Sequence, residues 1–384
     1  MNILGGKDMG KRTQIVLIAI LCVMVLGMAG CSKGGGQAQG GATAAAPKET
    51  FVLRMQTVQG SNQVEFKMLQ EMSEELFKVS DGRLKVEVNP LGTFASSLES
   101  FQACMNGVFD ICANYGTWLK SVDYALHVIT TGNMAMDPIA KRVWLYEFGG
   151  FEMAERLFAK ANMEFLTMHT DGTEVMIARE PFSSISQLKN KKFRTSDPRL
   201  AKEVGIAGMT MPLEEIFTAF QTGAIDVIEY GYLTFDQRLG LTDAARYAIY
   251  PDFWNVHNSI SIAINKQSYA KLPPDLQAML KMAFRAYEFR QFTATQFASA
   301  VTMQELETSK KNEFLRFKSD EFINLRKLMY DVVEAADIKE YGGATKEVYD
   351  SYYKFYKIWY PYKKISRWWG EDLTPEQMAG FPLK

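Results

Sequence analysis

The sequence has little of what the common catalytic and metal centres are made from. Its 384 residues include only three histidines, His127, His169 and His257, and none has a metal-ligand spacing to a cysteine or a carboxylate. No Gly-x-Ser-x-Gly elbow, phosphate loop, HExxH helix or dinucleotide fingerprint occurs, and the glycines of residues 34–41 lack the strand and helix that phosphate binding needs. These absences remove the usual ways of building an enzyme, so no catalytic residue is predicted.

An excess of charge of either sign is also missing. Lys and Arg number 43, Asp and Glu number 44, and no basic stripe with interleaved aromatic residues appears before the C-terminus, so nothing there predicts nucleic-acid binding. Cysteine is scarce, and beyond the N-terminal region only Cys104 and Cys112 remain, on either side of an expected helix-to-strand turn. A disulfide between them stays open. Two buried free thiols are the favoured interpretation, because cysteine is among the most buried residue types.

An apolar run does occur near the N-terminus, where residues 15–26 follow a positively charged start. The run is too short for a membrane-spanning helix, which needs ~20 residues, and predicts an export signal. Residues 28–31 resemble a lipoprotein cleavage box, with Met28 where Leu is usual. That resemblance implies a lipidated Cys31 as the first mature residue, anchored to a membrane in the periplasm or at the cell exterior; an ordinary cleaved signal is the alternative. Residues 32–49, rich in Gly, Ala and Gln, predict a flexible tether that spans roughly 20–25 Å.

From residue 50 onward, the hydrophobic pattern alternates between the periods of strands and helices. Strands are expected at residues 51–56, 84–88 and 109–113, with helices at 63–79 and 98–105 between them. The pattern then starts again, with strands at 165–168, 192–194 and 225–229 and a helix at 213–222. Two separate runs of this kind predict an α/β protein with two lobes and mostly parallel strands.

Three later segments extend this picture. Residues 259–265 alternate strictly and predict a strand that crosses back between the lobes. Residues 275–309 contain neither Pro nor Gly, and together with Pro273 and Pro274 before them they predict a very long helix. The aromatic-rich C-terminal stretch fits a membrane-facing or partner surface, or a packing face wrapped across both lobes. Packing is favoured, because aromatic rings bury large areas. Its aromatic residues are Tyr349, Tyr352, Tyr353, Phe355, Tyr356, Trp359, Tyr360, Trp368 and Trp369.

Arg194 is the candidate binding residue in this pattern. It ends the expected strand at residues 192–194 and follows Lys191 and Lys192. A strand-end guanidinium can hold a carboxylate with two parallel hydrogen bonds, although from spacing alone a solvated basic strand end is the simpler interpretation. Phe253 and Trp254 fit the wall of a cleft and the interior of a core equally well.

Several segments, in their order and spacing, resemble the solute-binding component of a TRAP transporter of the DctP type. The resemblance covers roughly residues 51–369 and implies a two-lobed periplasmic-binding-protein fold (type II-like), with crossing hinge strands and a long helix that spans both lobes. The first lobe is expected at residues 50–171 and 261–299, and the second at 172–260 and 300–384 with C-terminal wrapping helices. The supporting segments are residues 80–86, 107–110, 185–194, 211–229, 264–266 and 272–277.

Proteins of this family bind organic acids between their lobes and deliver them to membrane permease subunits, so the resemblance implies a binding protein rather than an enzyme. The arginine that grips the carboxylate in the family falls on Arg194. An extracytoplasmic enzyme acting on a small carboxylate and a ligand-binding sensor subunit are the alternatives, because a fold alone does not fix function.

Within the family, the sequence is most similar to the branch that binds 2-oxo and 2-hydroxy monocarboxylates, in which a metal ion often bridges protein and substrate. Glu229 falls on one metal-ligand position, with Tyr230 in place of the usual Trp, but a second acidic ligand falls on Asn255 and an expected Gln on Thr173. Fewer charged oxygens weaken a hard-cation site, so no cofactor is predicted, and Glu229 is a metal ligand only if a metal is present.

The expected ligand-binding residues comprise those that fall on family positions and an aromatic-rich neighbourhood around them. Their aromatic members suit a bulkier acid, such as an indole or phenyl carboxylate. The set comprises Arg194, Tyr115, Trp118, Thr173, Glu229, Tyr230, Phe253 and Trp254.

Overall fold

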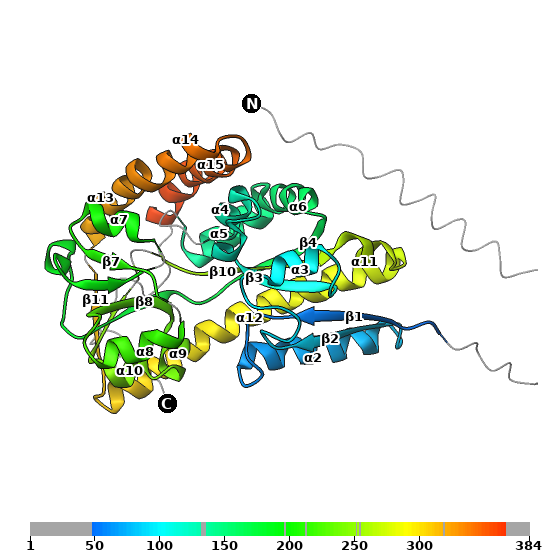
Figure 1. Ribbon diagram of the computed structural model, residues 1–384, viewed down its shortest axis with the longest axis horizontal. Coiled ribbons are helices and arrows are strands. Elements are labelled where there is room, and N and C mark those ends of the chain that lie inside the picture. The colour runs from blue at the N-terminus through cyan, green and yellow to red at the C-terminus, as the bar shows by residue number, and fades with distance from the viewer. Residues whose placement is uncertain are drawn as a thin grey trace, which may run out of the picture. The chain divides into compact units, whose positions relative to one another are not determined.

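The computed structural model describes residues 48–131, 136–195, 197–211, 213–250, 252, 255–317 and 319–365, which form an α/β body with two separate sheets (Figure 1). The predicted export signal, Cys31 and most of the predicted tether lie outside the described residues, as do Trp368 and Trp369. Across the described ranges, none of the helices is both long enough and apolar enough to cross a membrane. The predicted α/β class with two lobes is confirmed.

The first sheet belongs to the first lobe and mixes parallel and antiparallel strands. Its spatial order is β2 (Leu84–Asn89), β1 (Phe51–Gln56), β3 (Ile111–Tyr115), β10 (Ser259–Asn265) and β4 (Met163–Thr170). β1 is parallel to β2 and β3, whereas β10 is antiparallel to β3 and β4. In β2 the alternation predicted from sequence places Leu84 and Val86 in the core and leaves Lys85 and Glu87 exposed.

Helices cover both faces of this sheet. The helices of the lobe are α2 (Val64–Val79), α3 (Ser100–Met105), α4 (Tyr124–Thr130), α5 (Pro138–Glu147), α6 (Gly150–Lys160) and α11 (Lys266–Ala270), with a 3₁₀ turn η1 (Gly116–Leu119). α2 packs on one face through side chains such as Leu69 and Leu76. α3 to α6 pack on the other face, where Trp144 and Phe158 are fully buried. The amphipathic spacing of these helices therefore decides which side each one covers.

The second sheet belongs to the second lobe. Its spatial order is β11 (Glu313–Arg316), β9 (Tyr247–Tyr250), β5 (Glu174–Ala178), β8 (Val227–Tyr232), β6 (Lys192–Arg194) and β7 (Ala207–Met209). β6 is parallel to both β7 and β8, and β5 is antiparallel to β8 and β9. The shorter elements around this sheet are η2 (Ile185–Leu188), α7 (Pro198–Glu203), α8 (Leu213–Gln221), α9 (Leu233–Arg238) and α10 (Leu241–Ala244). Because β6 and β8 are parallel, their carboxyl ends meet at one edge of the sheet, which places Arg194 near residues 229–232.

Long helical segments connect the lobes. α12 (Pro274–Thr308) contacts α2 and β4 in the first lobe and α9 in the second, which confirms the predicted long helix (Figure 1). The chain continues through α13 (Ser319–Met329), a π-helical turn η3 (Tyr330–Glu334), α14 (Ala335–Tyr341) and α15 (Gly343–Ile365). α13 packs in the second lobe through Leu325, whereas α15 buries Tyr352 and Phe355 in the core of the first. Tyr349, Tyr352 and Phe355 of the aromatic C-terminal stretch therefore form a packing face, whereas Tyr360 is 48% exposed.

Two elements, β10 and α15, are associated with the first lobe although residues in them were expected in the second. β10 belongs entirely to the first sheet, although the expected boundary fell between residues 260 and 261. α15 packs on α4, α5 and α6 of the first lobe, although residues 300–384 were expected with the second. Sequence spacing could not reveal this, because the side on which a C-terminal helix docks depends on which core offers a matching apolar face.

Cys104 and Cys112 are buried free thiols in the structure, as predicted. The Cys104 sulfur contacts the Asp110 carbonyl oxygen at 3.4 Å, and burial raises the pKa of this thiol well above its ordinary value. A buried, protonated thiol behaves as a small apolar side chain, which fits their place in the first-lobe core.

The crossing between β4 and β5 carries a buried carboxyl group, that of Asp171. It accepts a hydrogen bond of 2.8 Å from Gln291 on α12. Burial, reinforced by the nearby charge of Glu65, raises the pKa of Asp171 to about 8. Glu65 lies on α2 of the first lobe and accepts a hydrogen bond from the Tyr232 hydroxyl of the second, so an acidic, buried contact joins the lobes at this hinge.

Replacing Asp171 with asparagine is expected to make the free energy of unfolding less dependent on pH. The folded pKa of about 8 lies above the ordinary value of 3.8, so the wild-type protein loses stability as the pH rises between these values, because the unfolded state releases its proton first. One pKa unit corresponds to about 1.4 kcal/mol. The free energy of unfolding of the variant, relative to that of the wild type, should therefore increase by about 2 kcal/mol or more between pH 5 and pH 8.

Urea unfolding of the ligand-free protein at the two pH values measures this change. Asp243→Asn is the matched control, because Asp243 is an exposed acid paired with Lys311 on the surface of the second lobe. A stability difference between Asp171→Asn and the wild type that is the same at both pH values would contradict the prediction.

Candidate functional site

Arg194 lies at the carboxyl end of β6 and is half-buried rather than solvated. Its Nη1 atom donates a hydrogen bond of 2.5 Å to the backbone carbonyl of Glu229, at the corresponding end of β8. Its guanidinium carbon lies 4.9 Å from the ring centroid of Tyr230, a cation–π distance. These two contacts hold the guanidinium against the edge of the second sheet, so the simpler interpretation of a solvated strand end is not what the structure has.

Three acidic side chains gather beside Arg194. Ligand atoms of Glu174, Glu229 and Asp252 all lie within 4.8 Å of one another, and the three residues are at most 1% exposed. Burial raises the pKa of Glu174 well above its ordinary value, and the charges of Glu229 and Asp252 act in the same direction. Three carboxylates buried this closely repel one another unless protons or a cation neutralise part of their charge.

A fourth buried acid, Asp236 of α9, lies in the same surroundings. Burial raises its pKa well above the ordinary value, the Arg194 charge opposes that shift, and the Glu229 charge adds to it. Arg194 is therefore the cationic group in a largely acidic neighbourhood. Electrostatically, this part of the second lobe is suited to hold a cation together with an anion.

The aromatic residues predicted for the first lobe lie together at the end of β3. The rings of Tyr115 and Trp118 meet edge to face, with centroids 5.2 Å apart. Burial raises the pKa of the Tyr115 hydroxyl, and the charges of Asp171 and Tyr230 add to the effect. Tyr230 in turn stacks on Phe235, with centroids 5.6 Å apart. Aromatic side chains from both lobes thus share one region.

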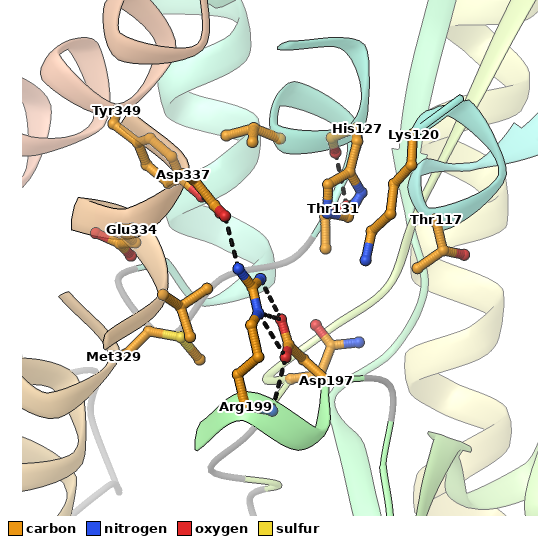
Figure 2. Close-up of a pocket in the computed structure, with 13 residues that line it drawn as sticks. Thr117, Lys120, His127, Thr131, Asp197, Arg199, Met329, Glu334, Asp337 and Tyr349 are labelled. Atoms are coloured by element: carbon orange, nitrogen blue, oxygen red, sulfur yellow. Dashed lines mark hydrogen bonds and ion pairs between the residues drawn. The ribbon is translucent and has the colours of Figure 1, made fainter. Parts of the chain in front are cut away.

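A pocket opens between the lobes (Figure 2), but none of the predicted ligand-binding residues that the structure describes is among those that line it. η1 and α4 form one side, and α7, η3 and α14 form the other, with an empty volume of about 620 Å³ that includes the part open to solvent. The lining residues are Thr117, Lys120, His127, Val128, Thr131, Asp197, Arg199, Asn255, Met329, Val333, Glu334, Asp337 and Tyr349.

Asn255 connects this pocket to the acidic cluster, because its Nδ2 atom lies 3.5 Å from a carboxylate oxygen of Glu174. His127 on the opposite wall is neutral near pH 7, since burial lowers its pKa to about 3. Lys120 is exposed at the pocket, and partial desolvation lowers the pKa of its amine. The pocket thus presents neutral polar groups and a cation on its first-lobe side.

The structure brings most of the predicted site residues together and adds others. Arg194, Glu229 and Tyr230 meet at the edge of the second sheet, and Tyr115 with Trp118 occupies the first-lobe side. Thr173 is half-buried at the crossing between β4 and β5. Phe253 and Trp254 lie outside the described residues.

Sequence reasoning missed two of the three clustered acids. The alignment placed the expected ligands on Thr173 and Asn255, whereas the structure brings in Glu174, one residue later, and Asp252, three residues earlier. The available signal was an acid one residue after Thr173 and another three residues before Asn255. A strand alternates its faces with every residue, so a shift of one position changes which side chain reaches the site.

Comparison with known proteins identifies the family. Residues 55–339 match the family model for the bacterial extracellular solute-binding protein, family 7, named DctP. The chain belongs to this family. That result confirms the resemblance to TRAP solute-binding components, and the coarser expectation that the protein is a component that binds a substrate for a transporter.

A curated relative of the DctP chain is a monocarboxylate 2-oxoacid-binding periplasmic protein of Nostoc. It is 21% identical over 300 residues, which cover 77% of this chain and 81% of the relative. Its location agrees with the periplasmic or extracellular place expected for the family.

Solved structures of TRAP periplasmic solute-binding proteins share the fold. One from Pseudoalteromonas atlantica, with bound sodium and pyruvate, has a TM-score of 0.73 and 19% identity over 83% of this chain and 97% of its own. Another from Bordetella bronchiseptica, with calcium and picolinate in its active site, has a TM-score of 0.74 and 18% identity over 83% of this chain and 95% of its own. At these identities the similarity establishes the two-lobed fold.

Proposed function

We propose that this DctP-family protein captures an organic acid between its two lobes and delivers it to TRAP permease subunits in the membrane. The observation that carries the proposal is the position of Arg194, a guanidinium held at a strand end of the second lobe by the Glu229 carbonyl and the Tyr230 ring. A guanidinium in a fixed orientation can take a carboxylate through two parallel hydrogen bonds. The names of the Nostoc relative and of the pyruvate and picolinate complexes support an acid as the solute.

In this proposal the remaining site residues surround the body of the acid. Tyr115 and Trp118 approach from the first lobe and Tyr230 from the second, so that closing of the lobes would cover an apolar or aromatic body with aromatic rings. Thr173, at the crossing between β4 and β5, is a further proposed polar contact. Phe253 and Trp254 remain proposed wall residues.

We also infer that Glu174, Glu229 and Asp252 can hold a hard cation such as Ca²⁺ or Na⁺. Oxygen ligands from carboxylates are what these ions prefer, and three buried carboxylates within 4.8 Å of one another fit that preference. When bound, the cation would neutralise the cluster and offer a positive charge to the oxygens of the acid. Sodium and calcium in the related solved structures support this inference.

A thermal-shift screen tests the proposed function. The purified protein is heated with 2-oxo acids, 2-hydroxy acids, dicarboxylates, uronates and aromatic acids, each with and without added Ca²⁺. A ligand that binds only the folded state at 100 times its Kd stabilises the protein by about 2.7 kcal/mol and raises the Tm. We expect at least one class of acid to raise the Tm, and neutral analogues such as the corresponding alcohols or amides to have no effect. A flat response to every acid would count against acid capture.

Binding without chemical turnover is part of the same proposal. Mass spectrometry of the acid recovered after long incubation with the protein should find it unchanged. A new product would favour the extracytoplasmic enzyme. A sensor subunit would also return the acid unchanged, and it would be distinguished by binding to a membrane kinase or chemoreceptor instead of permease subunits.

Anchoring through a lipid on Cys31 remains a proposal, supported by the similarity of residues 28–31 to a lipoprotein cleavage box. Cell fractionation distinguishes the alternatives. A lipidated wild-type protein would sediment with membranes and a Cys31→Ser variant would lose the lipid, whereas an ordinary cleaved signal would leave both forms in the soluble fraction.

A further inference from the structure

A buried carboxylate lies near the site, where the chain passes from the second lobe back to the first through η3 and α14. Asp337 of α14 is 1% exposed and accepts three hydrogen bonds. Tyr124 of α4 donates to Oδ1 at 2.9 Å, and Tyr349 of α15 donates to Oδ2 at 2.9 Å. Arg199 of α7 donates from Nη1 to Oδ1 at 2.7 Å. The first two donors belong to helices that pack in the first lobe, and the third belongs to the second lobe.

Arg199 is itself fixed at the start of α7. Asp197 caps that helix by accepting a hydrogen bond of 3.0 Å from the Arg199 backbone nitrogen, and its carboxylate also receives the Arg199 side chain at distances of 2.5–3.1 Å. Figure 2 shows the guanidinium lying between the carboxylates of Asp197 and Asp337 at the edge of the pocket. The orientation of Arg199 is therefore determined from both lobes.

The place of Arg199 in the chain connects this contact to the proposed ligand site. Arg199 follows Arg194 by only five residues, and the segment between them leads from β6 into α7. Thr195, which directly follows Arg194, is fully buried. The contact between Asp337 and Arg199 therefore lies close in the chain to the strand end that presents Arg194.

The helix that carries Asp337 is preceded by a π-helical turn. The π-helical turn η3 joins α13, which packs in the second lobe, to α14, which leads into the first. Arg326 and Glu334 pair across this turn with two hydrogen bonds of 2.9 and 3.2 Å. π-helical turns interrupt the regular ladder of a helix and are frequent at functional sites, so a change of angle between the lobes can be absorbed here.

We propose that Asp337 is a positioning residue for ligand capture, which pairs with Arg199 between the lobes and thereby stabilises the closed arrangement in which residues of both lobes line the pocket. This inference rests on the proposed function, because it concerns the regulation of the same site. A contact that favours the closed form adds to ligand affinity without touching the ligand, since the ligand binds tightly only to the fraction of molecules that are closed.

The test uses Arg199→Met, which keeps an unbranched side chain but removes its charge, and Arg199→Lys, which keeps the charge. Arg246→Met is the matched control, because Arg246 pairs with Glu313 within the second lobe and bridges no lobes. Calorimetric titration with the acid identified by thermal shift, melting of the ligand-free protein and small-angle X-ray scattering are measured for each variant.

Arg199→Met is expected to weaken ligand binding about tenfold, which corresponds to about 1.4 kcal/mol, and Arg199→Lys to restore part of the loss. The Tm of the ligand-free variant should stay close to that of the ligand-free wild type. The radius of gyration of the ligand-free variant should exceed that of the ligand-free wild type, and at saturating ligand the two proteins should have the same radius of gyration. Arg246→Met should leave affinity and radius of gyration unchanged.

Unchanged affinity in Arg199→Met, or a lowered ligand-free Tm with unchanged affinity, would overturn the positioning role while leaving acid capture intact. If the wild type binds no acid, the proposed function fails instead. Scattering of the ligand-free proteins then still decides this inference, because an equal radius of gyration for wild type and Arg199→Met overturns it and an increase supports it.

Discussion

Arg194→Ala is expected to lower the affinity for the acid about a hundredfold or more, which corresponds to about 3 kcal/mol or more. The physical reason is that the ligand carboxylate would lose its charged partner in a site surrounded by buried acids. Glu229, Asp236 and the rest of the acidic cluster would then repel the anion, since Arg194 is the cation that opposes them. Calorimetric titration of wild type and variant with the same acid measures the change.

Two further variants show whether the effect belongs to the guanidinium itself. Arg194→Lys keeps a positive charge but lacks the planar fork, so it should restore only part of the affinity. Lys191→Ala removes a neighbouring cation that pairs with Glu180 on the surface, and it should leave binding unchanged. Equal affinity in Arg194→Ala and wild type would remove Arg194 from the site.

A chelator is expected to lower the affinity for the acid at least tenfold if the cluster of Glu174, Glu229 and Asp252 holds a divalent cation, and added Ca²⁺ should restore it. Added Ca²⁺ should also raise the Tm of the ligand-free protein, because an ion that binds only the folded state stabilises it by mass action. In Asp252→Asn and Glu229→Gln both responses should be lost. Each change removes one charged oxygen ligand from a site that has three.

The alternative for this cluster is that protons, rather than a cation, neutralise it. In that case Ca²⁺ and Na⁺ would leave the Tm unchanged, and Glu229→Gln would raise the Tm near pH 8 by removing a repelling charge from beside Glu174. Asp243→Asn is the control in both experiments, since it removes an exposed acid from the surface. The two explanations therefore give opposite results with the same variants.

Much of the fold could be predicted from local pattern. The strand Phe51–Gln56 and the strand Ser259–Asn265 have the bounds expected from their apolar alternation. The helix Pro274–Thr308 follows from a long stretch of helix formers after two prolines. Such signals are local, because a strand or helix buries one face and its residues repeat with the period of that face. The order of strands in each sheet and the docking of α15 in the first lobe are not local, and pattern alone did not predict them.

Some residues of the candidate site could be predicted from the sequence, and others could be found only in the structure. Arg194 could be singled out because its place at a strand end and its match to a family position agree, and the contacts with Tyr230 and Glu229 fit that choice. Glu174 and Asp252 were missed because they are 78 residues apart in the chain and an error of one to three positions in alignment hides them. Asp337 and Arg199 left no sequence signal, since each is an ordinary charged residue on a short helix.

By itself, therefore, the sequence determined the α/β class, the two lobes, the long helix and the family, because these follow from periodicity and from motifs whose members lie close together in the chain. Only the tertiary structure decided which charges meet: the three acids beside Arg194, and the carboxylate of α14 that reaches Arg199 across the pocket. The interaction between two charges depends on their separation in space and on their burial, and neither quantity is written in the spacing of residues along a chain.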